Sequence, residues 1–296
     1  MDLQEYLSSK RALVDKALDE ALPTGDNDAA VLHRAMRYSL FAGGKRIRPI
    51  LAMAAAEAVG GRAERVLPLA VALECIHTYS LIHDDLPAMD DDDVRRGKPA
   101  LHKAFGEAVA ILAGDALLTF AFEVLASARV VRAFPPERLA ASISELAVAA
   151  GWQYLIAGQV ADIISEGKAV EVETVDRIVH GKTAALIRVS LTGGAMLAGG
   201  TRAQIEILGR FGEDLGVAFQ LRDDLLDLEG DPEEMGKAVK KDQRRGKATY
   251  PNLVGKARTK EMMIGLVSSA IETIGPLGER AEPLASIGKF IVERTS

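Results

Sequence analysis

Two aspartate-rich segments hold the side chains of this sequence that are best suited to chemistry. The first runs from Asp84 to Asp93, and the second reads Asp-Asp-Leu-Leu-Asp from Asp223 to Asp227. Carboxylates crowded in this way repel one another unless a cation lies between them. Hard oxygen ligands suit Mg²⁺, which proteins usually hold with one or two carboxylates together with substrate phosphates. Two such segments facing each other would therefore hold a polyanion through several Mg²⁺ ions.

The spacing of the carboxylates differs between the two segments. Asp223 and Asp227 are four residues apart, so they share one face of a helix. Asp84 and Asp90 are six residues apart and would lie on different faces of a regular helix. Pro87 lies between them and cannot continue the helical hydrogen bonds, which predicts a local break that returns Asp90 to the side of Asp84. One acidic run is more often a solvated surface, but two runs that each follow an apolar segment favour a metal site.

Basic residues recur near glycines and near the acidic runs. Gly43-Gly44 precedes Lys45-Arg46-Ile47-Arg48, in which Lys45 and Arg48 are spaced to converge on one anion. The arginine fork matches phosphate oxygens, while lysine acts as a point charge. The further candidates are Arg95, Arg96, Lys182, Lys237 and Lys247. Each alone is more often a surface charge, but together with the carboxylates they predict two anionic groups in one site, one bound through Mg²⁺ and one held directly.

The elements that must position these residues are helices. Strand signals are nearly absent, and apolar residues recur at spacings of three and four, which predicts an all-α fold of about ten or more helices. No linker divides the 296 residues, so we expect a single domain over residues 1–296 whose long helices enclose a deep central cavity. Thr201 and Gln204 predict a capping box, and the polar segment 230–247 is expected to act as a flap. The expected helices cover residues 2–20, 28–42, 47–59, 64–90, 107–129, 136–165, 171–197, 201–228, 232–242 and the segments after 248.

The composition limits the classes of partner and compartment. The net charge of −6 is concentrated in the two acidic segments, so no nucleic-acid surface is expected. The single cysteine, Cys75, excludes an intramolecular disulfide framework and fits a reducing compartment. The first residues lack the apolar region of a signal peptide, so we expect a cytoplasmic protein. Residues 108–128 are largely apolar but contain Asp115 and Glu123, which favours a buried helix over a membrane span.

The apolar helix before the first acidic segment offers a place for an oily ligand tail. Tyr79 lies five residues before Asp84, about 7.5 Å towards the helix start. Tyr79, with the adjacent Ser80, is a candidate for the floor that limits tail length, although spacing alone equally allows a tyrosine packed in the core. His77 and His83 lie on the same segment, and nothing around them supplies the ligand set of a zinc site.

These motifs together resemble the short-chain trans-isoprenyl diphosphate synthase family, and most of all its bacterial farnesyl diphosphate synthases. Residues 80–99 are similar to the first aspartate-rich motif of that family, and residues 219–227 are similar to the second. Gly43 to Pro49, Gly114-Asp115, Gly181-Lys182-Thr183 and Gly246 to Pro251 also match, in the family's order. The resemblance covers residues 30–255 and implies the isoprenoid synthase fold, Mg²⁺ as cofactor and a homodimer.

The resemblance also implies a role for each matching residue. The isopentenyl diphosphate would be held by Lys45, Arg48, His77 and Arg96. Three Mg²⁺ ions on the allylic diphosphate would be bound by carboxylates of the two motifs, and the predicted ligands are Asp84, Asp85, Asp90, Asp223, Asp224 and Asp227. That diphosphate would also contact Arg95, Lys182, Lys237 and Lys247. The developing allylic cation would lie near Thr183 and Gln220. The implied reaction is a head-to-tail addition of isopentenyl diphosphate to dimethylallyl or geranyl diphosphate.

The implied product and the rival functions depend on particular residues. An aromatic residue at the position of Tyr79 is typical of family members that stop at the C15 product, farnesyl diphosphate. The C20 product, geranylgeranyl diphosphate, is the alternative. A class I terpene cyclase would share the fold but usually lacks a second Asp-Asp-x-x-Asp motif, which is present here from Asp223 to Asp227. A non-catalytic prenyl-binding subunit typically loses carboxylates from one motif, and none is missing here.

Overall fold

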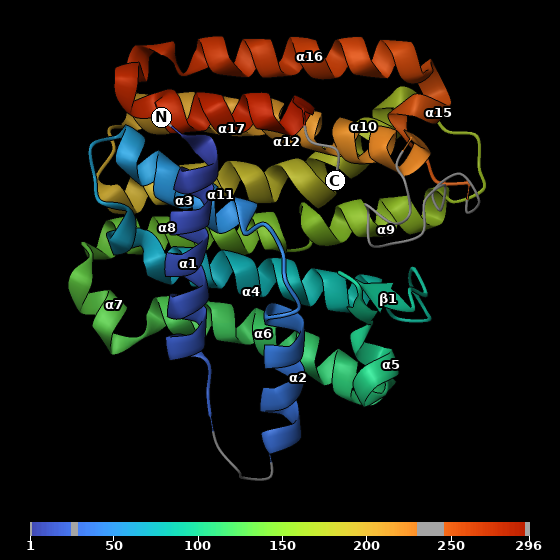
Figure 1. The fold of residues 1–296 in the computed structure, drawn as a ribbon, viewed down its shortest axis with the longest axis horizontal. Coiled ribbons are helices and arrows are strands. Elements are labelled where there is room, and N and C mark those ends of the chain that lie inside the picture. Colours follow the sequence, from blue (N-terminus) through green and yellow to red (C-terminus); the bar gives the residue numbers. More distant parts are fainter. Residues whose placement is uncertain (1, 25–28, 230–245, 294–296) are drawn as a thin grey trace.

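The computed structural model describes residues 2–24, 29–229 and 246–293, and this part of the chain is almost entirely helical (Figure 1). The α-helices are α1 (Leu3–Ala21), α2 (Ala30–Leu40), α3 (Ile47–Ala58), α4 (Leu67–Asp84), α5 (Leu101–Phe105), α6 (Glu107–Ala126), α7 (Ala128–Ala133), α8 (Pro136–Ala150), α9 (Leu155–Ser165), α10 (Val172–Val179), α11 (Ala185–Ala198), α12 (Arg202–Glu229), α15 (Tyr250–Val254), α16 (Lys256–Thr273) and α17 (Glu282–Glu293). The shorter elements are the 3-10 helices η1 (Ala63–Val66) and η3 (Gly275–Ala281), the π-helical turn η2 (His180–Ala184), and the strands β1 (Val94–Arg95) and β2 (Lys98–Pro99).

Two apolar helices, α4 and α11, form the centre of the bundle. α4 packs against α6 and α3, and α11 packs against α3, α8 and α12. α12 packs against α16, which lies at the top of the view in Figure 1, whereas α6 lies in the lower half. Every residue from Leu69 to Ile76 of α4 is buried. A helix that is apolar around its whole circumference is stable only inside a protein, which explains its central place.

The packing of α11 against α3 requires a residue without a side chain. A Cβ atom added at Gly194 of α11 would lie 2.2 Å from the backbone oxygen of Ala52 in α3. That oxygen belongs to a helical hydrogen-bond ladder and cannot move aside. The contact sets the distance between two functional segments, because α3 follows the Lys45–Arg46 loop and α11 follows the π-helical turn that contains Lys182.

The expected all-α class is confirmed, and several expected helices are divided. Residues 64–90 form η1 and α4, and α4 ends at Asp84. Residues 136–165 form α8 and α9, because the backbone is extended at Gly151. Residues 171–197 form α10, the π-helical turn and α11. The predicted capping box is present, since the Thr201 N–H donates to Gln204 Oε1 over 2.9 Å. The expected helix 232–242 lies outside the described residues.

The hairpin β1–β2 and the helix α5 were not expected from the sequence. Val94 pairs with Pro99 and Arg95 with Lys98. The two residues between the strands, Arg96 and Gly97, both have positive φ, at 53° and 73°. Positive φ at both central positions is the geometry that suits a tight two-residue hairpin. Strands of two residues are too short for an alternating pattern to show in the sequence.

Three segments are long and apolar enough to cross a membrane by length and composition, namely Ala63–Asp84, Glu107–Ala133 and Pro136–Ser165. In the most apolar stretch of 18 residues within Ala63–Asp84, 67% of the stretch is buried inside the fold. The corresponding stretches of the other two segments are only 33% buried. The interpretation of residues 108–128 as a buried helix is therefore wrong for one face. Ile111 and Leu112 of that helix are exposed.

Candidate active site

A cavity of about 800 Å³ opens between α4, α6, α9, α12 and the π-helical turn. Its wall contains charged and polar side chains from both halves of the chain, namely Asp84, Asp223, Arg48, His77, Arg95, Arg96, Lys182, Thr183 and Gln220. The rest of its wall is mainly apolar and includes Tyr79, Leu118, Leu155, Val160, Leu186 and Phe219. The deep central cavity expected from the sequence is thus present, and its wall combines a charged group with a larger apolar part.

The predicted break after Asp84 is present. The chain leaves α4 and turns back, so that the Asp90 N–H donates to the Asp84 carbonyl oxygen over 2.7 Å. Two further backbone hydrogen bonds close the turn. The Asp91 N–H donates to the Leu86 carbonyl oxygen, and the Asp92 N–H donates to the Asp85 carbonyl oxygen. The turn therefore brings Asp84 and Asp90 together, although a regular helix would separate them.

The carboxylates of this turn are bridged by lysines from distant segments. Lys182 Nζ lies 2.9 Å from Asp162 and 3.9 Å from Asp84. Lys247 Nζ lies 3.2 Å from Asp90 and 3.7 Å from Asp162. Burial and the neighbouring Asp90 raise the pKa of Asp84, and Lys182 works against this rise. Burial lowers the pKa of Lys182, but Asp84 and Asp162 outweigh it and the net shift is upwards.

Asp162 is a member of this cluster that sequence reasoning missed. It comes from α9, is 6% exposed, and joins Lys182 to Lys247. Gln159, one turn earlier on α9, lines the cavity, and the oxygen and nitrogen of its side-chain amide are buried without a hydrogen-bond partner among the described residues. The only sequence signal is the spacing of Gly158-Gln159 and Asp162 on one helical face. Gly158 is needed there, because a Cβ atom would lie 2.5 Å from the backbone nitrogen of Lys182.

The other predicted metal ligands have different surroundings. Asp85 is 2% exposed, and its two carboxylate oxygens share the Arg95 Nε–H, at 2.9 and 3.2 Å, while Arg95 Nη2 donates to Asp85 as well. Burial lowers the pKa of Arg95, but the Asp85 carboxylate outweighs this and raises it overall. Asp85 is absent from the wall of the large cavity, whereas Arg95 lines it. This carboxylate therefore acts first as the partner that orients Arg95.

The second aspartate motif lies on α12, with Asp223 at the cavity wall. Asp224 and Asp227 are 4% and 5% exposed. Asp224 accepts a hydrogen bond of 2.9 Å from Gln220 Nε2, and Gln220 Oε1 accepts one of 2.7 Å from the Thr183 hydroxyl. This chain of hydrogen bonds fixes the orientation of the Thr183 and Gln220 side chains at the cavity wall.

A second anion-binding group, made of two arginines and a neutral histidine, lies at the same end of the cavity. Arg48, His77 and Arg96 line the wall. Burial lowers the pKa of Arg48, and the charges of Glu74 and then Asp223 partly oppose this shift. Burial and the surrounding arginines hold the pKa of His77 well below its usual value, so His77 is neutral and can donate one hydrogen bond to an anion. Gly44 makes room for Arg96, whose guanidinium carbon would lie 2.7 Å from a Cβ atom there. Lys45 is exposed and is absent from the cavity wall.

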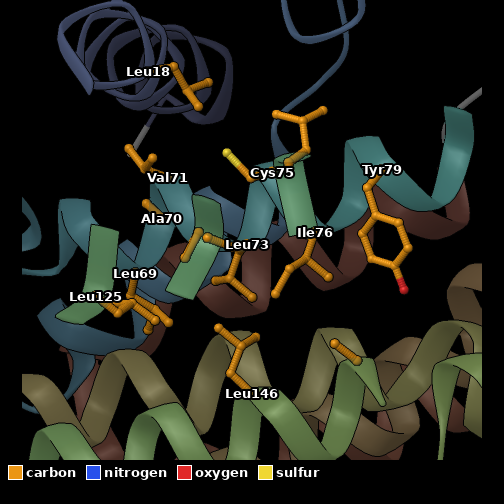
Figure 2. Close-up of a cluster of buried hydrophobic side chains, with 14 of the residues drawn as sticks. Leu18, Leu69, Ala70, Val71, Leu73, Cys75, Ile76, Tyr79, Leu125 and Leu146 are labelled. Carbon is orange, nitrogen blue, oxygen red and sulfur yellow. The ribbon is translucent and has the colours of Figure 1, made fainter. Parts of the chain in front are cut away.

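Tyr79 lies where the apolar part of the cavity meets the packed core. Its ring makes an edge-to-face contact with His83, with centroids 5.7 Å apart. In Figure 2, Leu73, Ile76 and Tyr79 leave α4 on the same side, and Leu146 points towards them from the opposite helix. Leu73, Ile76 and Leu146 are fully buried, so the space behind Tyr79 is filled. Ser80 also lines the cavity, and its hydroxyl donates to the His77 carbonyl oxygen.

The donor set of the charged end suits Mg²⁺. Asp84, Asp90 and Asp223 supply hard oxygen ligands from two elements, and the lysines at the first cluster show that this place attracts cations. A separate group that could hold a metal ion consists of Asp91, Asp93 and His102, although Lys103 Nζ already lies 2.8 Å from Asp93. Lys237 and most of the expected flap lie outside the described residues, so their prediction stays open.

Comparison with known proteins gives one consistent family. The polyprenyl synthetase family model matches residues 29–272. The chain is 47% identical to a geranylgeranyl pyrophosphate synthase of Capsicum annuum, over 98% of the chain and 78% of that protein. It is 46% identical to a heterodimeric geranylgeranyl pyrophosphate synthase large subunit of Arabidopsis thaliana, over 99% of the chain and 80% of that protein. The structure of an FPP/GFPP synthase from Zymomonas mobilis matches with a TM-score of 0.88 and 35% identity, over 98% of this chain and 99% of that one. The chain therefore belongs to the polyprenyl synthetase family of prenyltransferases and has the isoprenoid synthase fold.

Proposed function

We propose that this prenyltransferase condenses isopentenyl diphosphate head-to-tail with an allylic diphosphate, by Mg²⁺-dependent ionisation, condensation and elimination. The observation that carries the proposal is that two different anion sites share one end of an apolar cavity. One is the carboxylate and lysine cluster around Asp84. The other consists of Arg48 and Arg96 with the neutral His77 beside them, and is called the cation group below. An enzyme that joins two diphosphates needs both sites and an apolar space for the growing chain.

The residues around Asp84 would bind the allylic diphosphate. Three Mg²⁺ ions held by the carboxylates would supply Lewis-acid stabilisation of the charge that develops on the departing pyrophosphate. Lys182 and Lys247 form ion pairs with Asp84, Asp90 and Asp162, and they would turn from these carboxylates to the same diphosphate. Cationic groups that are in place before ionisation stabilise the leaving group without reorganisation, which is usually the largest catalytic contribution.

The opposite group would hold the isopentenyl diphosphate. The guanidinium groups of Arg48 and Arg96 match its phosphate oxygens, and neutral His77 donates a hydrogen bond. Thr183 and Gln220, fixed by their hydrogen bonds, would direct oxygen atoms towards the allylic cation. The apolar walls exclude water, which would otherwise convert the cation to an alcohol. The departing pyrophosphate would take the proton that is lost after condensation, so no side-chain base is required.

The length of the product has two candidates. The two plant relatives named above are geranylgeranyl pyrophosphate synthases or a subunit of one, and they favour the C20 product over the C15 product that Tyr79 led us to expect. We therefore give geranylgeranyl diphosphate as the first candidate. Farnesyl diphosphate is the second, and one observation supports it. Tyr79 is 6% exposed and is backed by a filled core, as a floor residue would be.

The assembly we propose is a homodimer in the cytoplasm. The exposed apolar side chains of α6 and α9 would be covered by a second copy, among them Ile111, Leu112, Val160 and Ile164. The Arabidopsis relative is named as the large subunit of a heterodimer, so a related but different subunit is the competing partner. Both plant relatives are named as chloroplastic proteins.

The first test is product analysis of the purified protein. We expect the protein with Mg²⁺, isopentenyl diphosphate and either dimethylallyl or geranyl diphosphate to release pyrophosphate and a longer prenyl diphosphate. Mass analysis of the prenyl alcohols after dephosphorylation gives the chain length: geranylgeraniol supports the first candidate and farnesol the second. Absence of condensation with both allylic substrates would contradict the proposed function.

A carboxylate variant links turnover to the metal cluster. Asp223→Asn keeps the side-chain shape but removes a charge, and we expect kcat to fall roughly 10²–10³-fold, as when one transition-state contact is lost. The melting temperature should stay near that of the wild type, because Asp223 lies at a cavity wall. Asp214→Asn, on the same helix but bonded to the surface residue Ser269, is the matched control with unchanged kcat. A variant at Asp223 with full turnover and unchanged Mg²⁺ dependence would exclude this carboxylate from the metal site.

A further inference from the structure

We propose that Arg46 and Glu74 are positioning residues for the isopentenyl diphosphate pocket, which they hold in its binding geometry from behind. The inference rests on the proposed function, because it gives the Arg48, His77 and Arg96 group its ligand. Neither Arg46 nor Glu74 lines the cavity. They act through the backbone and charges of the residues that do.

Arg46 is turned away from the cavity, although Lys45 and Arg48 flank it in the sequence. It is 3% exposed, and all three nitrogens of its guanidinium group have partners. Nε donates to Asp15 over 2.8 Å, Nη1 to Glu74 over 2.6 Å, and Nη2 to the Leu40 carbonyl oxygen over 2.6 Å. A guanidinium group engaged in this way is not available to a phosphate. Its three partners come from α1, from α4 and from the end of α2, so Arg46 connects three helices at one point.

The backbone of Arg46 adopts a conformation that is unfavourable for a residue with a side chain. Its φ is 55° and its ψ 33°, in the left-handed region, immediately before α3 begins at Ile47. Such a conformation persists in a non-glycine residue only where the surroundings hold it. The buried guanidinium contacts supply that hold. The left-handed turn sets the direction in which the chain enters α3, and therefore where Arg48 in the first turn of α3 points.

Glu74 supplies the negative charge behind the cation group. Its side chain is 1% exposed, with Arg46 at 2.6 Å and Arg96 Nη2 at 4.0 Å. The Glu74 charge acts to raise the pKa of both Arg48 and Arg96, although burial lowers the pKa of each overall. His77 lies three residues further along the same helix, close to the same face. The Glu74 carboxylate thus contacts the cation group from the buried core, whereas the diphosphate would contact it from the cavity.

The buried Glu74 carboxylate reduces the repulsion between the neighbouring guanidinium groups. Burial lowers the pKa of Arg48 and of Arg96; the Arg96 charge lowers that of Arg48 further, and the Arg46 and Arg95 charges do the same for Arg96, so these guanidinium groups lie close enough to repel. Without Glu74 the empty pocket would relieve this repulsion by moving Arg48 and Arg96 apart. With Glu74 the two guanidinium groups stay in place before the ligand binds, so that less side-chain conformational entropy is lost on binding. The network therefore affects affinity for isopentenyl diphosphate more than any later step.

The test measures each substrate separately in Glu74→Gln and Arg46→Met. We expect the KM for isopentenyl diphosphate to rise roughly tenfold to a hundredfold, the change that follows from losing one or two charged hydrogen bonds. The KM for the allylic diphosphate and kcat should stay within about twofold, because ground-state binding of one substrate alone is weakened. Calorimetric titration with isopentenyl diphosphate alone, which allows no turnover, should show the same loss.

The matched control is Asp19→Asn, which breaks the exposed ion pair between Asp19 of α1 and Arg37 of α2. It disturbs helix contacts without touching the cation group and should leave both KM values unchanged. If Glu74→Gln fails to fold, Asp15→Asn carries the test, because it removes one of the three Arg46 contacts and should give a smaller rise in the same KM. Unchanged binding of isopentenyl diphosphate, or an equal rise of both KM values, would overturn the positioning role. A wild-type protein that does not bind isopentenyl diphosphate would instead overturn the proposed function.

Discussion

Backbone strain in this protein is concentrated in the residues that build the charged end of the cavity. Among the described residues, the non-glycine residues with positive φ are Arg46, Asp91 and Arg96. Arg46 precedes the α3 helix that carries Arg48, Asp91 follows the carboxylate Asp90, and Arg96 itself lines the cavity. Strained conformations of this kind cost about 1–3 kcal/mol each and persist where surrounding contacts enforce them. The fold is therefore destabilised locally at the positions that set the orientation of the charged groups.

Tyr79 is the single residue whose size most directly tests the limit on chain length. Burial, with Asp84 nearby, raises the pKa of Tyr79 to about 12, so the ring is neutral and acts as an apolar wall. We expect Tyr79→Met to lengthen the main product by one C5 unit, because a flexible thioether chain can move aside where a ring cannot. Product masses under the same conditions as the wild type measure this change.

The control for Tyr79 is Tyr154→Met, since Tyr154 is 44% exposed and lies outside the cavity wall. It should leave the product unchanged. An unaltered product in Tyr79→Met would show that the limit lies elsewhere on the wall, for example at Leu118 or Leu186.

The helices position the site through close backbone contacts. The π-helical turn at His180–Ala184 presents Lys182 and Thr183 to the cavity, and π-helical turns of this kind frequently mark functional sites. Gly158 of α9 and Gly181 of the turn lie against each other, and a Cβ at Gly181 would come 2.7 Å from the Tyr154 carbonyl oxygen. Gly194 fills the same role between α11 and α3. The distances between the charged groups thus depend on positions that have no side chain.

Gly194→Ala tests this dependence. The added Cβ would lie 2.2 Å from the Ala52 oxygen, so α3 and α11 must move apart. We expect the free energy of unfolding to fall by about 1–3 kcal/mol or more, the usual cost of overpacking. Urea unfolding followed by circular dichroism measures the loss.

Gly265→Ala on α16 is the matched control, because nothing lies within 4 Å of a Cβ at that position. Alanine is the better helix former, so this variant should be about 0.5–1 kcal/mol more stable. A loss of stability in both variants alike would mean that the substitution itself, and not the contact with α3, is responsible.

On the scale of the whole molecule, polar and apolar surfaces are unevenly distributed. The helices α6 and α9 are rich in apolar residues, yet they leave Ile111, Leu112, Ile156 and Ile164 between 43% and 59% exposed. Ile156 also lines the cavity, so a partner that covers this surface would complete the outside of the cavity wall. Exposed large apolar side chains that gather on one part of a protein often mark an interface.

Leu112→Glu tests the homodimer that we propose. Leu112 is 58% exposed on α6, and a buried carboxylate from each copy would oppose association. Light scattering after size-exclusion chromatography should give twice the chain mass of 31.6 kDa for the wild type and the chain mass for the variant. Ile264→Glu, a 46% exposed position on α16, is the control and should remain dimeric. A monomeric wild type at micromolar concentration would exclude the homodimer.

The sequence by itself predicted the features that depend on neighbours along the chain. The all-α class follows from periodicity, the capping box at Thr201 from residues three apart, and the turn that joins Asp84 to Asp90 from Pro87. The breaks inside residues 136–165 and 171–197 were not predicted, because the apolar pattern continues across them and the break serves contacts with other helices. The hairpin after Asp93 was missed because its strands are too short to form a pattern.

The tertiary structure alone decided what depends on distant residues. It turned Arg46 into the core, paired Asp85 with Arg95, and brought Asp162 of α9 between Lys182 and Lys247. A charged side chain has the same identity in the sequence whether it binds a ligand, orients another charge or supports a backbone turn. Which of these it does is set by the partners within about 4 Å, the range over which ion pairs and hydrogen bonds act, and the packing of the helices supplies those partners.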